Sequence, residues 1–201
     1  MNEINPPWML QARKLMNVKR CGTFRTINSQ SVAEHSYYVA LLSFDIANYI
    51  ESNYEEDWKI DKSVLLLKAL LHDVEEGITG DIPHPMKNTF PFLKEGLDEG
   101  KRKILSEYFP SFASGFAMEA KKGKEGEIVE IADYVELYHY CVEEKLSGNR
   151  QVFLDDIMKT CRSIFLLKSI IIKETSDHYF DNLDKILKRG GLNDRRNHCY
   201  G

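Results

Sequence analysis

Apolar residues recur at helical spacing in nearly every long segment of the chain, and no internal repeat or low-complexity linker interrupts them. A segment of this kind buries one apolar stripe and keeps its opposite face polar, so several of them fold by packing on one another. We therefore expect an all-α fold, a helical bundle in a single domain. The periodicity predicts helices over about residues 8–16, 32–51, 62–76, 93–108, 126–146, 151–173 and 175–188.

Local signals set several of the expected helix ends. Ser31 and Glu34 form a capping-box pattern, in which the serine hydroxyl and the glutamate carboxylate satisfy free amides at a helix start. Asp61 can cap the next helix with its carboxylate. That helix is expected to stop before Gly77, and residues 121–126 are expected to form a solvated loop.

The bulk composition is that of one globular domain. Hydrophobic residues make up 43% of the 201 positions and charged residues 29%, which suits a packed core and excludes a disordered chain. We expect the domain over residues 1–190 and a flexible C-terminal tail over 191–201. A net charge of −4 gives no general attraction to nucleic-acid polymers or anionic membranes, so a small ligand is favoured.

Cysteine usage and the apolar runs indicate the compartment. The four cysteines are widely separated and include no C-x-x-C pair, which argues against a disulfide framework or a structural zinc site. The N-terminus lacks the apolar stretch of a signal peptide, and the runs 64–71 and 164–172 are too short to span a membrane. A cytoplasmic protein is expected.

The clearest candidate chemistry lies where the apolar segment LLLKALL runs into His72, Asp73 and Glu76. Consecutive helical residues lie about 100° apart, so His72 and Asp73 can lean towards one point, with Glu76 one turn beyond His72. Imidazole and carboxylate together suit a divalent ion that keeps open positions for water. The alternative is a helix end that becomes polar where it reaches solvent.

Asp133 and His35 are the other candidate ligands. Asp133 stands within the apolar stretch IVEIADYVELY, where a carboxylate needs a partner, either a metal ion or a lysine in a salt bridge. His35 opens its helix beside Glu34, and its alternative is a histidine packed near Tyr37 or Tyr38.

The order of these clusters resembles the HD-domain phosphohydrolases: an early His, a His-Asp pair 37 residues later, and an Asp 60 residues beyond that pair. A longer ordered series is similar to the YfbR-like branch of the bacterial 5′-deoxynucleotidases. Its members here are Arg20, Arg25-Thr26, Ser31-Val32-Ala33-Glu34-His35-Ser36, His72-Asp73-x-x-Glu76, Thr79-Gly80-Asp81-Ile82-Pro83-x-Pro85-x-Lys87 and Ala132-Asp133.

The resemblance implies one divalent metal ion (Mn, Co, Mg or Zn) with open positions for water and a phosphate oxygen. Glu76 matches the family's catalytic carboxylate, which orients the attacking water and moves protons. Asp81, the acid of a T-G-D motif, is implied to help position the substrate and reaction centre, and its alternative is a cap or turn aspartate. The ligands implied for the ion are His35, His72, Asp73 and Asp133.

Two cations are implied to face the substrate, and two positions depart from the family's pattern. Arg20 can contact phosphate with its planar guanidinium, and Lys87 is either a further phosphate contact or a solvated surface lysine. The arginine is usually followed by a Trp that helps to exclude a ribose 2′-hydroxyl. Cys21 leaves room there, so weaker selection for deoxyribose is expected. Glu130 replaces a common lysine, which removes a phosphate contact and favours monophosphates.

The leading hypothesis is metal-dependent hydrolysis of deoxynucleotide phosphate esters, converting a deoxynucleoside monophosphate (dNMP) to deoxynucleoside and phosphate. One alternative is a deoxynucleoside triphosphate hydrolase, like the phage dATP phosphohydrolases that deplete an adenine deoxynucleotide pool. Others are a nucleotide-sensing module without catalysis and a purely structural adaptor. The expected partner is a small-molecule nucleotide, with no nucleic-acid polymer and no membrane, and the resemblance implies a homo-oligomer, a dimer or larger.

Overall fold

The computed structural model describes residues 7–54, 58–83, 89–110 and 123–197, and it confirms the all-α prediction. Among these residues the only β pairing is an isolated bridge between Lys19 and Ser31. None of the described helices is both long enough and apolar enough to cross a membrane. The helices are α1 (Pro7–Lys14), a 3-10 turn (Leu15–Asn17), α2 (Val32–Asn53), α3 (Lys62–Leu71), α4 (Glu76–Thr79), α6 (Pro91–Tyr108), α7 (Gly123–Leu146), α8 (Phe153–Ser163) and α9 (Ile170–Asn197).

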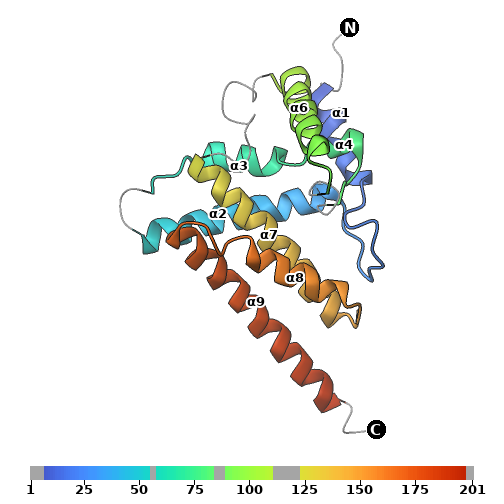
Figure 1. Ribbon diagram of the computed structural model, residues 1–201, viewed down its shortest axis with the longest axis vertical. Helices are drawn as coiled ribbons and strands as arrows, with labels where there is room; N and C mark the ends of the chain where they lie inside the picture. The colour runs from blue at the N-terminus through green and yellow to red at the C-terminus, as the bar shows by residue number, and fades with distance from the viewer. Residues whose placement is uncertain (1–6, 55–57, 84–88, 111–122, 198–201) are drawn as a thin grey trace.

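Helix α7 is the centre of the bundle, and α2, α3, α8 and α9 all pack against it (Figure 1). Its buried face includes Ile128, Ile131 and Val135, which meet Val39 and Ile46 of α2 in the main core. Each such aliphatic side chain contributes about 1.5–3 kcal/mol by leaving water. Helices α1, α4 and α6 gather at one end of the molecule (Figure 1), where Val74, Ile104, Leu105 and Phe109 form a smaller cluster.

Both predicted N-terminal caps are confirmed. The Ser31 hydroxyl accepts a hydrogen bond from the Glu34 amide at 3.2 Å, and the Glu34 carboxylate accepts one from the Ser31 amide at 2.7 Å. The Asp61 carboxylate accepts hydrogen bonds from the amides of Ser63 and Val64 at 2.9 and 3.1 Å. These caps fix where α2 and α3 begin.

The predicted single helix over 62–76 is wrong, because α3 ends at Leu71 and α4 is a separate turn. Between them the backbone tightens: the Val74 amide bonds to the Leu71 carbonyl at 3.3 Å, and the Glu76 amide bonds to the Asp73 carbonyl at 3.1 Å. These three-residue hydrogen bonds redirect the chain after α3. His72 and Asp73 therefore lie in a turn and not inside a helix.

Three other predicted boundaries also differ. The segment 151–173 is not one helix, since residues 164–169, which begin with turns at 164–167, separate α8 from α9. The loop predicted at 121–126 is wrong from residue 123 onward, because α7 already begins there. Helix α9 continues to Asn197, beyond the predicted end at residue 188. Flexibility of residues 191–201 stays a prediction.

Gly77 lets α4 lie directly against α1. A Cβ at this position would meet Gln11 Nε2 at 2.9 Å, the Gln11 carbonyl oxygen at 3.3 Å and Lys14 Cβ at 3.3 Å. Gln11 is buried and its Nε2 donates a 3.4 Å hydrogen bond to the Val74 carbonyl, so it cannot move away without losing that bond. Close packing here fixes the position of α4.

Gly77→Ala is accordingly expected to destabilise the protein by about 1–3 kcal/mol, the usual cost of overfilling a packed contact. The free energy of unfolding in urea measures the effect. Gly100→Ala in α6 is the matched control, because a Cβ there meets nothing within 4 Å. Alanine's helix propensity should stabilise that variant by up to about 1 kcal/mol. Equal stability of the two variants would contradict the packing argument.

Candidate metal centre

The structure brings His35, His72, Asp73 and Asp133 into one cluster. His35 comes from the first turn of α2, His72 and Asp73 from the turn after α3, and Asp133 from α7. His35 Nε2 lies 3.1 Å from His72 Nε2 and 3.2 Å from Asp133 Oδ1. His72 Nε2 lies 3.1 Å from Asp73 Oδ2. Both imidazoles are buried, whereas the two aspartates are partly exposed, so the cluster opens to solvent on the carboxylate side.

Hydrogen bonds on the outer side of each ring indicate its tautomer. His35 Nδ1 lies 2.6 Å from Glu136 Oε2, and His72 Nδ1 lies 2.7 Å from the Ala69 carbonyl oxygen. Because each partner is an acceptor, each Nδ1 carries a proton. In the neutral rings, two Nε2 lone pairs then face one another beside two carboxylates. Such a donor set calls for a cation between its members and fits a divalent ion.

The electrostatics of the cluster agree with this requirement. Burial and the Arg20 guanidinium lower the pKa of His35, but Glu136 and Asp133 outweigh them and raise it to about 9. Burial alone would raise the pKa of Asp73, yet the neighbouring His72 holds it well below its usual range. The site therefore stabilises positive charge on His35 and negative charge on Asp73.

Arg20 borders the cluster on a loop between the 3-10 turn and α2. Its NH1 lies 3.6 Å from Asp73 Oδ2 and its NH2 lies 3.3 Å from Asp133 Oδ1. Burial lowers the pKa of the guanidinium, but Asp133 and Asp73 raise it overall, so Arg20 stays charged. Its amide bonds to the Gln30 carbonyl at 2.9 Å, which holds the loop beside the start of α2. The guanidinium is thus placed to contact an anion bound at the cluster.

The other predicted site residues are Glu76, Asp81, Cys21 and Lys87. Glu76 is buried at the start of α4, and its amide bonds to the Asp73 carbonyl at 3.1 Å. Asp81 Oδ2 accepts a 2.7 Å hydrogen bond from the Cys21 amide, which ties the stretch after α4 to the Arg20 loop. Cys21 has a left-handed backbone with φ of 54°. Lys87 lies outside the described residues.

Sequence reasoning missed Glu136 and Gln30. Glu136 is buried one turn after Asp133 on α7, and its Oε1 accepts a 2.5 Å hydrogen bond from Gln30 Nε2. The signal was present: Glu136 is a second carboxylate in the apolar stretch that singled out Asp133. Its partner could not be read from the chain, because His35 is 101 residues away.

A further carboxylate anchors the Arg20 loop from outside the cluster. Glu144, buried on α7, accepts hydrogen bonds from the amides of Ile27 and Asn28 at 2.8 and 2.6 Å. A third hydrogen bond to Glu144 comes from Asn149 Nδ2 at 2.7 Å. The loop that carries Arg20 is therefore fixed to α7, the helix that also carries Asp133.

Comparison with known families decides the relationship. A family described as 5′-deoxynucleotidase YfbR-like matches residues 7–182 of the chain. The chain belongs to the YfbR-like family. A 5′-deoxynucleotidase of Vibrio atlanticus is 28% identical over 142 residues, covering 67% of this chain and 72% of the relative. The 5′-deoxynucleotidase YfbR of Escherichia coli is 27% identical over 149 residues, covering 70% and 74%.

Solved structures share the YfbR-like chain's fold. A conserved protein from Pyrococcus furiosus superposes with a TM-score of 0.69 at 25% identity, covering 89% of this chain and 98% of that one. An HD-domain phosphohydrolase from Listeria innocua gives 0.67 at 22% identity, covering 90% and 97%. A cyanophage S-2L HD phosphohydrolase, bound to dA and one catalytic Zn²⁺ ion, gives 0.63 at 22% identity, covering 94% and 98%.

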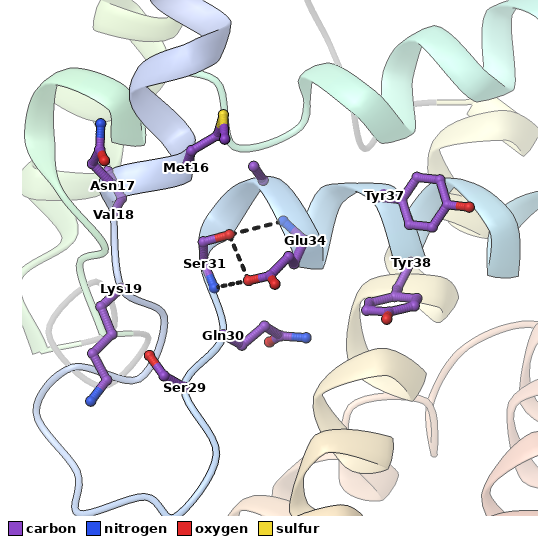
Figure 2. A pocket seen from close by; sticks show the side chains of 11 residues that line it. Met16, Asn17, Val18, Lys19, Ser29, Gln30, Ser31, Glu34, Tyr37 and Tyr38 are labelled. Atoms are coloured by element: carbon purple, nitrogen blue, oxygen red, sulfur yellow. Dashed lines mark hydrogen bonds between the residues drawn. The ribbon is translucent and has the colours of Figure 1, made fainter.

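This YfbR-like chain also has a cavity of about 580 Å³ beside the start of α2, shown in Figure 2. Met16, Lys19, Tyr37 and Tyr38 are among its lining residues, and none of the four clustered residues is. The Glu34 carboxylate there is turned towards Ser31 in the capping box (Figure 2). Glu34 is therefore a structural neighbour of His35 and not a member of the cluster.

Proposed function

We propose that this chain is a metal-dependent 5′-deoxynucleotidase that hydrolyses dNMP to deoxynucleoside and phosphate. The observation that carries the proposal is the convergence of two imidazole nitrogens with two carboxylates, bordered by the partly buried Arg20. The 5′-deoxynucleotidases among its relatives support the substrate class. The cyanophage enzyme of the same fold, bound to dA and one catalytic Zn²⁺, supports both the nucleotide and the ion.

His35, His72, Asp73 and Asp133 would hold the ion. When bound, a divalent ion would supply Lewis-acid polarisation of the phosphoryl group and acidify the attacking water. Two neutral imidazoles with two carboxylates accept several divalent ions, so Mn, Co, Mg and Zn are all candidates. The outward hydrogen bonds of both rings support this role, because they leave Nε2 as the donor atom of each.

Three other residues would bind the phosphate, transfer protons and hold the Arg20 loop. Arg20 would bind the phosphate with its planar guanidinium. Glu76 would take a proton from water as the oxygen attacks phosphorus, and the bond from phosphorus to the 5′ oxygen breaks. The 5′ oxygen leaves with a proton, which Glu76 can return. Asp81 would hold the backbone at Cys21 and so keep Arg20 in place.

The ion pair at Glu130 changes the argument about triphosphates. Glu130 Oε2 lies 2.8 Å from Lys168 Nζ, so its negative charge is balanced and repels a polyphosphate less than expected. A deoxynucleoside triphosphate hydrolase is therefore the second candidate. The preference for monophosphates rests on the relatives and not on Glu130.

The deciding experiment is a panel of separate dNMPs, dNTPs and ribonucleotides assayed with the Mn²⁺-, Co²⁺-, Mg²⁺- or Zn²⁺-loaded protein. Release of phosphate from dNMPs supports the proposal. Release of pyrophosphate or triphosphate from dNTPs supports the second candidate. Turnover of no nucleotide with any of these ions would refute both, and tight binding without product would favour a sensor.

Cys21→Trp is expected to sharpen the choice of sugar. Cys21 lies directly beside Arg20 and is half-buried, so a Trp indole here would fill space next to the phosphate contact. We expect the ratio of kcat/KM for dAMP over AMP to rise about 10-fold, the usual scale of steric discrimination. Cys21→Ala is the control and should leave that ratio unchanged. An equal ratio in all three proteins would mean that this position does not contact the sugar.

A further inference from the structure

The two histidines of the cluster are held by different kinds of partner. His72 Nδ1 bonds to the neutral carbonyl of Ala69, three residues earlier in its own segment. His35 Nδ1 bonds at 2.6 Å to the carboxylate of Glu136, which comes from another helix. The local chain therefore orients His72, whereas a long-range carboxylate orients His35.

Both carboxylate oxygens of Glu136 have a hydrogen-bond partner. Its side chain is only 5% exposed, and its second oxygen accepts the 2.5 Å hydrogen bond from Gln30 Nε2. The backbone carbonyl of Gln30 also accepts a 2.9 Å hydrogen bond from the Arg20 backbone amide. The same residue therefore contacts both the Arg20 loop and Glu136. A buried carboxylate costs free energy unless it is fully paired, and here both of its oxygens are used.

A carboxylate behind a histidine has a defined effect on a metal site. It keeps the proton on Nδ1, fixes the plane of the ring and makes Nε2 a stronger donor to an ion. We propose that Glu136 is a positioning residue, which sets the tautomer and orientation of His35 and so strengthens metal binding. The inference rests on the proposed function, since it concerns the same ion, but Glu136 itself is neither a ligand nor a substrate contact.

A purely structural role predicts something different. In that case Glu136 would only hold α2 against α7, and its loss would lower the stability of the metal-free protein without changing its affinity for the ion. The positioning role predicts that affinity falls and that the ligand field of a bound ion changes. Metal binding therefore separates the two roles, whatever happens to stability.

The test measures Co²⁺ affinity by competition with a chromogenic chelator, together with the visible absorption of bound Co²⁺. The variants are Glu136→Leu, which removes the acceptor, and Glu136→Gln, which keeps an acceptor oxygen but removes the charge. Glu143→Leu is the matched control, because Glu143 is an exposed carboxylate on the same helix and lies 3.6 Å from Nδ1 of the exposed His139 ring, away from the cluster.

Glu136→Leu is expected to bind Co²⁺ about 10- to 100-fold more weakly with a shifted spectrum, the usual scale for such a partner. Glu136→Gln should fall between Glu136→Leu and wild type, and Glu143→Leu should match wild type. If Glu136→Leu does not fold, Glu136→Gln decides alone. Wild-type affinity and spectrum in the folded variants would overturn the inference, even with a lower melting temperature.

The wild-type protein distinguishes failure of this inference from failure of the proposed function. If wild type binds Co²⁺ and hydrolyses dNMP while both Glu136 variants bind Co²⁺ equally well, only the positioning role is overturned. If wild type binds no Co²⁺ and also hydrolyses no nucleotide with any of the four ions, the proposed function is overturned together with the inference.

Discussion

Asp73→Asn is expected to lose metal binding and to lower kcat/KM for dNMP hydrolysis about 10³-fold. The substitution keeps the shape of the side chain and removes its charge. Asp73 Oδ2 lies 3.1 Å from His72 Nε2, and the low pKa of the carboxyl keeps it ionised. A neutral amide is a much weaker donor to a divalent ion. Without the ion, several kcal/mol of transition-state stabilisation is lost, and each 1.4 kcal/mol or so is a factor of ten.

Metal content after purification in defined Zn²⁺ or Mn²⁺ and steady-state kinetics check this prediction together. Asp98→Asn on the exposed surface of α6 is the control and should keep both the ion and the activity. Arg20 loses one of its two carboxylate partners in Asp73→Asn, so circular dichroism confirms that the fold persists. A variant with one bound ion per chain and near wild-type kcat/KM would show that Asp73 is not a ligand.

The sequence predicted most of the bundle because local patterns determine it. The capping residues Ser31 and Asp61 marked the starts of α2 and α3, and both caps form. The end of α3 was missed because residues 72–76, which form the tight turns after Leu71, include no glycine or proline to signal a helix end. The break between α8 and α9 also lacks glycine and proline. Where tertiary packing ends a helix, periodicity alone runs past its end.

In the candidate site too, some residues could be predicted from the sequence and others could not. The order of His35, His72, Asp73 and Asp133 predicted the cluster, and the structure brings all four together. Glu136 was missed because its meaning depends on a contact with His35 that joins α2 to α7. Asp81 has a partner that no motif indicates, the Cys21 amide. A motif carries the residues that a family shares, while the hydrogen bonds around them depend on how the whole chain folds.

Glu76 and its neighbour Glu75 allow a direct test of catalysis without loss of the ion. Both carboxylates are buried and adjacent, but Glu75 lies 3.1 Å from Lys101 Nζ in an ion pair with α6. Burial raises the pKa of Glu75, and Lys101 opposes that rise. Glu75 therefore has a structural partner on α6, whereas Glu76 begins α4 and is bonded through its backbone to Asp73. The pair provides a matched control within one turn.

Glu76→Gln is expected to lower kcat about 10²- to 10⁴-fold, the contribution of a positioned general base, while metal content stays at the wild-type level. Glu75→Gln should lower stability because it leaves Lys101 with a neutral partner, but it should leave kcat within a few-fold of wild type. Steady-state hydrolysis of dNMP measures kcat, metal analysis measures the bound ion, and urea unfolding measures stability. Asp73→Asn loses the ion and the activity together, whereas Glu76→Gln separates them. A Glu76→Gln enzyme with wild-type kcat would assign the proton transfer to another group.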